Sequence, residues 1–265
     1  MNVLVLIKYS LDVSEIKVDP DSADLLLEGV PRKIGDIDKN VVEAAVQLTA
    51  DSNSKIQALT LGPLKARDGF RDVLAMGLDE VILIEDPFDG QAESVVAITI
   101  LEAAIKKITD FDLIICGFAS DDGYTFQVAP RLAERLNLPL VSYVSQLSVE
   151  DDSLIATREL DDSLQVISVP LPAVVSIAEE AFPPRRTTLM DALKAKDKPV
   201  NVWHVGDELD LDLENMTEIG KIETAYQKGV IISRKRNLLK GKTPVELADQ
   251  LIDALLKENV IKGNE

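Results

Sequence analysis

The sequence predicts an α/β fold in which a mostly parallel β-sheet is flanked by helices. Short runs rich in β-branched residues alternate with segments whose apolar residues recur at helical spacing, which is the pattern of βαβ units. Aromatic residues make up only 4 % of the 265 residues, so Val, Ile, Leu and Ala must supply a core covered on both faces. The apolar content of 46 % argues against a disordered chain.

The first half of the chain alternates strands and helices in a regular order. VLVLIKY is typical of a central strand, and the helix that starts after Gly-Pro is closed near Gly77. Pro130 must lie in the first turn of its helix or bend it. Strands are predicted at 3–9, 55–63, 80–86 and 112–117, and helices at 40–52, 64–79, 93–108 and 124–138.

The pattern changes after Pro139. The runs LVSYVSQLSVE, DSLIATREL, LQVISVP and AVVSIA are separated by short polar breaks such as EDD and LDD. Such breaks are typical of hairpins, so the sheet is predicted to gain antiparallel strands. Residues 183–198 are predicted to run from a loop into a helix.

The last part of the chain is predicted to be a C-terminal extension. Residues 205–224 are acidic and weakly patterned, which indicates an extended connection. Residues 242–260 form an amphipathic pattern, with Thr243 placed as N-cap and Pro244 in the first turn. We expect a main domain over 1–200 and an arm with a terminal helix over 201–265.

Charge and residue usage exclude several functions. A formal net charge of −18 repels nucleic acid and anionic membranes, and no apolar run is long enough to span a membrane. Cys116 is the only cysteine and is expected to be a buried small hydrophobe. His204 is the only histidine, which excludes a histidine metal cluster or a Ser-His-Asp triad built elsewhere. The first residues form a strand pattern rather than a signal peptide, so a cytoplasmic location is expected, with an organelle matrix as the alternative.

Three strand ends are candidate ligand sites. The chain has neither a GxGxxG motif after its first strand nor a Walker A motif, so a standard Rossmann dinucleotide site and a P-loop site are not predicted. Ligands of open α/β sheets nevertheless bind at the carboxyl ends of strands. These ends are IKYSLD (7–12), TLGP (60–63) and CGFASDDGYTFQ (116–127).

The third strand end is the richest in polar groups. Asp121 or Asp122 is expected to cap the following helix, and Gly123 permits a tight turn. The N-terminus of that helix suits a phosphate, to which Thr125 can donate, while Gln127 can bind a ribose or a base edge. A capped helix with solvated polar residues explains the same pattern. The other aspartate pairs, 151–152 and 161–162, fit turn chemistry, and no metal site is predicted.

At this loop the sequence resembles the β (small) subunit of electron transfer flavoprotein. The likeness extends to about residue 205 and includes four motifs in the order of the family. They are GPLKARDGFRDVLAMGLDEVILIED (62–86), GFASDDGYTFQVAPRLAERLNLP (117–139), TRELDDSLQVISVPLPAVVSIA (157–178) and PPRRTTLMDALKAKDK (183–198).

The resemblance implies a Rossmann-like fold of the adenine nucleotide alpha hydrolase-like type. It also implies an electron-carrier subunit rather than a stand-alone enzyme. Such a subunit pairs with an α subunit that carries FAD, and it binds a second adenine nucleotide, either AMP or, in electron-bifurcating members, FAD. The bifurcating pattern DGDTAQVGP is matched by DGYTFQVAP at Asp122, Gly123, Thr125, Gln127, Val128 and Pro130, which favours FAD over AMP, whereas Tyr124, Phe126 and Ala129 depart from that pattern. A partner dehydrogenase, for which an acyl-CoA dehydrogenase is a candidate, or NADH in a bifurcating complex, is the implied electron donor.

The resemblance also implies the site residues. Arg158 matches an arginine near the α-subunit flavin, where its charge stabilises the reduced form. Leu189 matches an exposed leucine that anchors a partner dehydrogenase. The family's Asn-Pro-aromatic motif is missing, because Gly35-Asp36-Ile37 stands in its place before Asp38. The implied nucleotide contacts are Leu6, Asp38, Leu61, Gly62, Gly117, Asp121, Asp122, Gly123, Tyr124, Thr125, Phe126, Gln127 and Val128.

Two other functions stay open at this point. In one, AMP only stabilises the heterodimer of a non-bifurcating relay. In the other, the chain is an enzyme of the related hydrolase-like fold, such as an ATP pyrophosphatase. Against the enzyme, the first strand end reads KYSLDVSE and lacks an SGGxDS-type pyrophosphate loop.

Overall fold

The structure is a computed structural model that describes residues 1–50, 54–88, 94–212 and 235–261. Contacts divide the described residues into two units. One unit contains those of Met1–Lys17 and Leu25–Gln227, and the other those of Val18–Asp24 and Lys228–Glu265. The main sheet belongs to the first unit. The predicted boundary at residue 200 stays a prediction.

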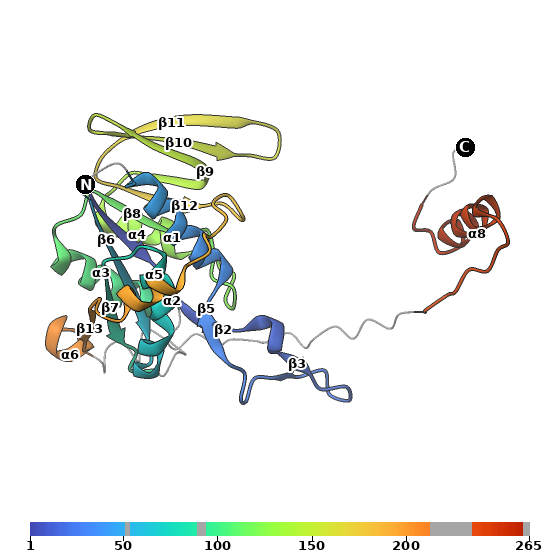
Figure 1. Cartoon of the computed structure of the whole chain (residues 1–265), viewed down its shortest axis with the longest axis horizontal. Helices are drawn as coiled ribbons and strands as arrows, with labels where there is room; N and C mark the ends of the chain where they lie inside the picture. Colours follow the sequence, from blue (N-terminus) through green and yellow to red (C-terminus); the bar gives the residue numbers. More distant parts are fainter. Residues whose placement is uncertain (51–53, 89–93, 213–234, 262–265) are drawn as a thin grey trace. The chain divides into compact units, whose positions relative to one another are not determined.

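Within the described residues the main sheet has nine strands in the order β11-β10-β9-β12-β8-β1-β6-β7-β13 (Figure 1). Seven neighbouring strands, in the order β9-β12-β8-β1-β6-β7-β13, are parallel to one another. β10 and β11 add an antiparallel meander beyond β9. This mixed sheet confirms the predicted fold class. The strands are β1 (Asn2–Leu6), β6 (Lys55–Gly62), β7 (Glu80–Glu85), β8 (Leu113–Gly117), β9 (Leu140–Glu150), β10 (Ser153–Glu159), β11 (Leu164–Pro170), β12 (Ala173–Ile177) and β13 (Val200–Trp203).

Two strands differ from the prediction. β12 is parallel to both β8 and β9 rather than part of the antiparallel meander. All five of its residues are buried, which is the continuous burial of an interior parallel strand. β13 is not in the prediction. It has four residues at the edge of the sheet, and none of them is fully buried, so its apolar signal is weak.

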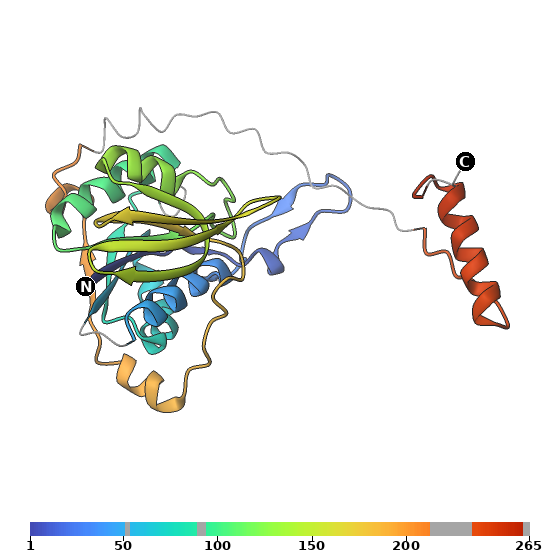
Figure 2. The same ribbon diagram turned by 90° about the horizontal axis from the view of Figure 1, so that it is seen from above.

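Helices cover both faces of the sheet (Figure 2). Val3 and Val5 of β1 belong to a core with α1 and α2, whereas Leu4 and Leu6 belong to a core with α3 and α4. This alternation follows from the two-residue period of a strand. The helices are α1 (Asp36–Leu48), α2 (Arg71–Met76), α3 (Ser94–Ile108), α4 (Val128–Leu136), α5 (Leu189–Ala195), α6 (Val205–Glu208) and α8 (Pro244–Lys257), with 3-10 turns η1 (Val13–Glu15) and η2 (Leu64–Phe70).

The segment between β1 and α1 contains short strands that the prediction lacks. β2 (Tyr9–Leu11) pairs in antiparallel fashion with β5 (Arg32–Ile34). β3 (Lys17–Val18) and β4 (Leu25–Leu26) have two residues each. Such short strands contain too few residues to show a period.

Several helix boundaries also differ from the prediction. α4 begins at Val128 instead of 124, because Tyr124 and Phe126 have left-handed backbones with φ of 46° and 59°. α1 runs from Asp36 to Leu48 instead of from 40 to 52, and residues 51 and 52 lie outside the described residues. The predicted helix over 64–79 is η2 followed by α2, closed as expected at Gly77, where φ is 139°.

The C-terminal predictions are confirmed in part. Thr243 is the N-cap of α8, since its side chain accepts from Glu246 N, and Pro244 is in the first turn. Val205–Glu208 form α6 instead of an extended connection. Residues 213–224 of that predicted connection lie outside the described residues.

Candidate functional site

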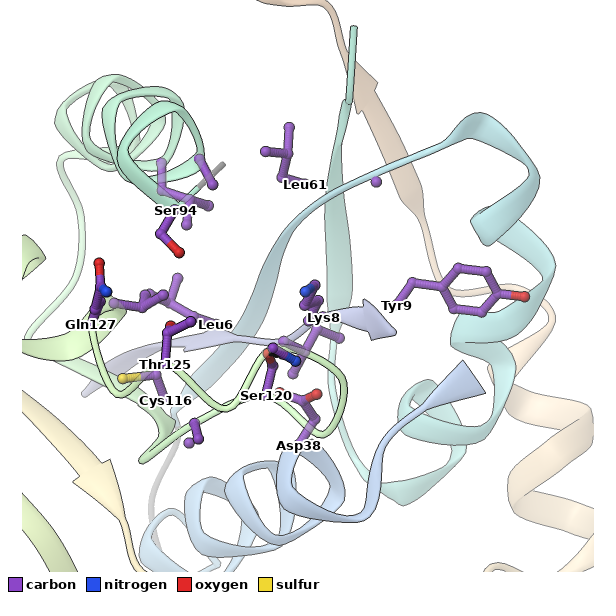
Figure 3. A pocket seen from close by; sticks show the side chains of 18 of the residues that line it. Leu6, Lys8, Tyr9, Asp38, Leu61, Ser94, Cys116, Ser120, Thr125 and Gln127 are labelled. Carbon is purple, nitrogen blue, oxygen red and sulfur yellow. Dashed lines mark hydrogen bonds between the residues drawn. The ribbon is translucent and has the colours of Figure 1, made fainter. Parts of the chain in front are cut away.

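A cavity lies at the carboxyl ends of three adjacent strands, β8, β1 and β6 (Figure 3). It encloses about 1020 Å³ of empty space, counting its open mouth. Leu6 ends β1, Gly62 ends β6 and Gly117 ends β8, and all three line it. The three candidate strand ends in the sequence therefore meet at one place, as expected for an open α/β sheet.

Most of the residues that the resemblance implies line this cavity. They are Leu6, Asp38, Leu61, Gly62, Gly117, Gly123, Thr125, Phe126, Gln127 and Val128. Asp121, Asp122, Tyr124 and Arg158 are not among the lining residues. The role of all these residues in binding a cofactor stays a prediction.

Asp122 binds Lys8 and does not cap α4, so the capping role expected from the sequence is wrong for this residue. Its Oδ1 is 2.6 Å from Lys8 Nζ and also accepts from Ser120 Oγ at 3.1 Å, while its Oδ2 accepts from Leu11 N at 3.3 Å. The N-cap of α4 is Gln127, which makes no side-chain cap bond. Burial raises the pKa of Asp122, but the charge and hydrogen bond of Lys8 outweigh it and hold the pKa below its usual value. Asp122 thus fastens the loop to the end of β1.

Asp121 lies against the start of α1 rather than α4. A Cβ on Gly35, the N-cap of α1, would lie 1.4 Å from Asp121 Oδ2. Burial and the negative charge of Asp36 raise the pKa of Asp121, and the backbone N–H of Asp36 offsets part of this. Asp121 therefore occupies the space that a side chain at residue 35 would need. This geometry accounts for a glycine at position 35.

Asp38 and Cys116 are two buried titratable residues that line the cavity. Asp38 is 4 % exposed, and its Oδ2 is buried without a hydrogen-bond partner among the described residues. Burial raises its pKa well above the usual value, as do the charges of Asp121 and Asp122, although the backbone N–H of Lys8 opposes this. Cys116 is buried, as predicted, and burial together with the charge of Asp38 raises its thiol pKa to about 12. A buried carboxyl oxygen without a partner at a cavity wall fits a polar ligand group.

Two positively charged residues that were not predicted as site residues, Lys8 and Arg32, line the cavity. The side chain of Lys8 is 44 % exposed, and Arg32 donates from Nη1 to Tyr9 O at 3.4 Å. Lys8 belongs to the candidate strand end 7–12, so its place in the sequence could have indicated that it lies at the site. Arg32 lies in β5, whose place beside the cavity depends on the unpredicted pairing with β2. These charges stand out in a chain of net charge −18 and suit an anionic ligand.

The described part of the chain has no cluster of metal-binding side chains and no helix that could span a membrane. Within it, no three His, Cys, Asp or Glu side chains lie close enough together to hold a metal ion. None of its helices has the length and apolar character needed to cross a membrane.

Comparison with known proteins gives a consistent result. Residues 25–208 match the electron transfer flavoprotein domain. This chain belongs to the electron transfer flavoprotein family. It is 35 % identical over 212 residues to the electron transfer flavoprotein subunit beta of Thermoanaerobacterium thermosaccharolyticum, covering 80 % of this chain and 81 % of that protein. The family assignment makes it an electron transfer protein of the beta-subunit type.

Two further relatives belong to reductase systems. The chain is 30 % identical over 268 residues to the caffeyl-CoA reductase-Etf complex subunit CarD of Acetobacterium woodii, covering 98 % of this chain and all of that protein. It is 31 % identical over 274 residues to the acryloyl-CoA reductase electron transfer subunit gamma of Anaerotignum propionicum, with coverage of 98 % and 100 %. The similarity to these two proteins therefore includes the part of the chain beyond residue 208.

Arg158 and Leu189, to which the resemblance gives roles toward partners, also lie outside the lining of the cavity. Arg158 is on β10, where the register with β9 shifts, and its Nη2 donates to Ser142 Oγ at 3.3 Å. Its Nε is buried without a hydrogen-bond partner in the described structure. The position of Arg158 in this chain alone thus gives it no contact with the cavity.

Leu189 is the first residue of α5 and is 78 % exposed. Thr188 caps this helix through a capping box with Asp191. The preceding segment is held to α1, because the guanidinium of Arg185 binds both carboxylate oxygens of Glu43 at 2.8 and 3.0 Å. The exposed leucine therefore stands on a firmly attached element.

Proposed function

We propose that this chain is the β subunit of a heterodimeric electron transfer flavoprotein and that it binds an adenine nucleotide in the cavity. FAD is the favoured ligand and AMP the alternative. The supporting observation is that the loop 117–128, which resembles the family's nucleotide loop, lines the same cavity as the ends of β1 and β6. The fold thus gathers the predicted contacts from three distant parts of the sequence.

The cavity fits the phosphate part of such a ligand. The first turn of α4 has backbone N–H groups without partners inside the helix, and its dipole favours an anion. Thr125 precedes this turn and lines the cavity, and Lys8 and Arg32 add positive charge. Asp122 keeps Lys8 in place through the 2.6 Å ion pair. We assign these residues to the phosphate groups.

Other lining residues fit the base and the sugar. Leu6, Leu59 and Leu101 are buried side chains that offer an apolar surface to a flat base. Asp38, in the neutral form that burial favours, can donate a hydrogen bond to the ligand, and Gln127 can both donate and accept. A Cβ on Gly62 would meet no atom closer than 3.9 Å, so glycine leaves open space at the wall.

A bound flavin supplies the redox chemistry, whereas the chain binds it, orients it and excludes water from it. In this role the chain passes electrons from a dehydrogenase, or from NADH in a bifurcating complex, to an acceptor. Gly123, Val128 and Pro130 match the bifurcating pattern and support that form. The alternative is a non-bifurcating relay in which AMP is structural. A cytoplasmic location belongs to the proposal and is supported by a free, buried Cys116.

The partners follow from the same proposal. The α subunit carries its own FAD, and we assign Arg158 to the surroundings of that flavin. We assign α8 to a contact with the α subunit, because Val245, Leu251 and Ile252 on it are 48 to 69 % exposed. Relatives named for CoA-linked reductases support a dehydrogenase of acyl-CoA type as the electron partner, anchored at Leu189.

The cofactor content of the co-purified heterodimer tests the proposal. The complex is denatured and the released nucleotides are separated by chromatography. Two FAD per complex supports bifurcation, and one FAD with one AMP supports the relay. A complex with one FAD and no second nucleotide contradicts the proposed site.

A further inference from the structure

Four aromatic rings cluster in a chain that has few of them, and two of the four, Phe118 and Phe126, line the cavity. Phe118 is buried and has the rings of Tyr124, Phe126 and Tyr143 at centroid distances of 5.5 to 5.6 Å. Tyr124 and Phe126 also contact each other edge to face at 5.0 Å. The whole sequence has only six Phe, four Tyr and one Trp, so this concentration is a local feature.

Two of these rings are held partly in solvent. Tyr124 is 50 % and Phe126 is 49 % exposed. Both have a left-handed backbone, with φ of 46° and 59°, a conformation that residues other than glycine and asparagine rarely adopt. Strained backbone combined with exposed aromatic surface is common where a loop presents side chains to a ligand. Phe126 lines the cavity, and Tyr124, which does not line it, packs against the Phe126 ring.

The order of groups along the cavity indicates what the rings meet. The deep wall is apolar and buried, as at Leu59 and Leu101, and suits one flat base. Thr125 and the first turn of α4 suit phosphates, and Phe126 lies next to both in sequence. A mononucleotide ends at its phosphate. A dinucleotide continues beyond it to a second flat ring, for which the half-exposed ring of Phe126 in the cavity wall offers a surface.

We propose that Phe126 and Tyr124 form a stacking surface for the second flat ring of a dinucleotide, so that they make the site prefer FAD to AMP. This inference rests on the proposed function of the cavity. Phe126 provides the contact surface, and Tyr124, which is supported by Phe118, holds Phe126 in place and extends the surface.

Binding of AMP and of FAD by the heterodimer tests this preference. The complex is depleted of the β-site nucleotide while the α subunit keeps its FAD, and each nucleotide is titrated in by calorimetry. Phe126→Leu keeps an apolar side chain but removes the ring. It is expected to weaken FAD binding about tenfold, the usual effect of one stacked ring, and to change AMP binding less than about twofold. Phe126→Tyr keeps a ring and is expected to preserve FAD binding.

Controls separate stacking from other effects. Val166→Ala removes exposed apolar surface on β11 and is expected to change neither affinity. Equal losses for AMP and FAD, or no loss for either, overturn the inference while leaving the proposed function intact. A loss of heterodimer formation in Phe126→Leu also overturns it, because the cluster is then a subunit contact. A wild-type complex that binds neither nucleotide overturns both proposals.

Discussion

Two Asp-Asp pairs in this chain have the same sequence and different surroundings. Asp121–Asp122 follow the parallel strand β8, and Asp161–Asp162 lie between the antiparallel strands β10 and β11. Asp122 binds Lys8 and Leu11, which are 114 and 111 positions away, whereas Asp162 accepts a hydrogen bond from the adjacent Ser163 Oγ at 3.0 Å. Asp161 and Asp162 are exposed.

The difference shows that topology decides what the pair does. The carboxyl end of a parallel strand meets its neighbours at one edge of the sheet, so its loop residues acquire partners from distant segments. A hairpin turn brings together only residues that are near in sequence. The first pair therefore helps to build a cavity, and the second serves a turn.

The largest expected effect comes from filling the space that Asp121 occupies. Gly35→Ala places a Cβ 1.4 Å from Asp121 Oδ2 and is expected to lower the free energy of unfolding by about 2–3 kcal/mol, as in overpacked cores. Urea unfolding measures this loss. Gly206→Ala is the matched control, because a Cβ there meets no atom within 4 Å.

A second substitution shows whether Asp121 causes the effect. Gly35→Ala combined with Asp121→Ser is expected to recover most of the lost stability, because the shorter side chain leaves room. An additive double-mutant cycle would contradict the described packing of residues 35 and 121.

Removal of a carboxylate from each pair compares them directly. Asp122→Ala breaks the ion pair to Lys8 and the bonds from Leu11 and Ser120, and is expected to cost about 1–2 kcal/mol, since Lys8 is partly solvated. Asp162→Ala is expected to change stability by less than about 0.5 kcal/mol. Equal losses in thermal or urea unfolding would remove the distinction between the pairs.

The smallest expected effect is a difference in pH dependence within the first pair. The pKa of Asp122 is lowered from 3.8, so its stabilisation is complete above pH 3.8 and is lost as the pH falls below that value. The pKa of Asp121 is raised from 3.8, so ionising it costs stability as the pH rises above that value. Asp122→Asn is therefore expected to destabilise the chain at pH 7, and Asp121→Asn to stabilise it.

Urea unfolding at several pH values between 3 and 7 checks these signs. Both differences from the wild type are expected to shrink toward acid pH. A change of the same sign in the two variants at pH 7 would mean that the two carboxylates share one environment.

The sequence predicted the frame of the site better than its details. Parallel βαβ order and three polar strand ends were sufficient to place the ends of β1, β6 and β8 together. The resemblance then selected residues such as Gly62, Gly117 and Thr125, which do line the cavity. These features depend on local pattern and on rules of sheet topology, both of which are visible in one sequence.

The missing details depend on distant contacts or on backbone conformation. The capping role predicted for Asp121 or Asp122 was wrong, because their partners lie near Gly35 and Lys8. The start of α4 was misplaced, since residue types do not reveal the positive φ at Tyr124 and Phe126. Arg32 was missed because the pairing of its short strand has no periodic signal.

The nucleotide content of three heterodimers tests the central claim most directly, namely that the loop after β8 holds a nucleotide. The complexes contain the wild-type chain, Asp122→Ala or Asp162→Ala, and each is denatured and analysed by chromatography after the same purification. The wild type and Asp162→Ala are expected to release one adenine nucleotide in addition to the FAD of the α subunit, and Asp122→Ala to release clearly less. A wild-type complex without this second nucleotide, or an equal loss in both variants, would contradict the account.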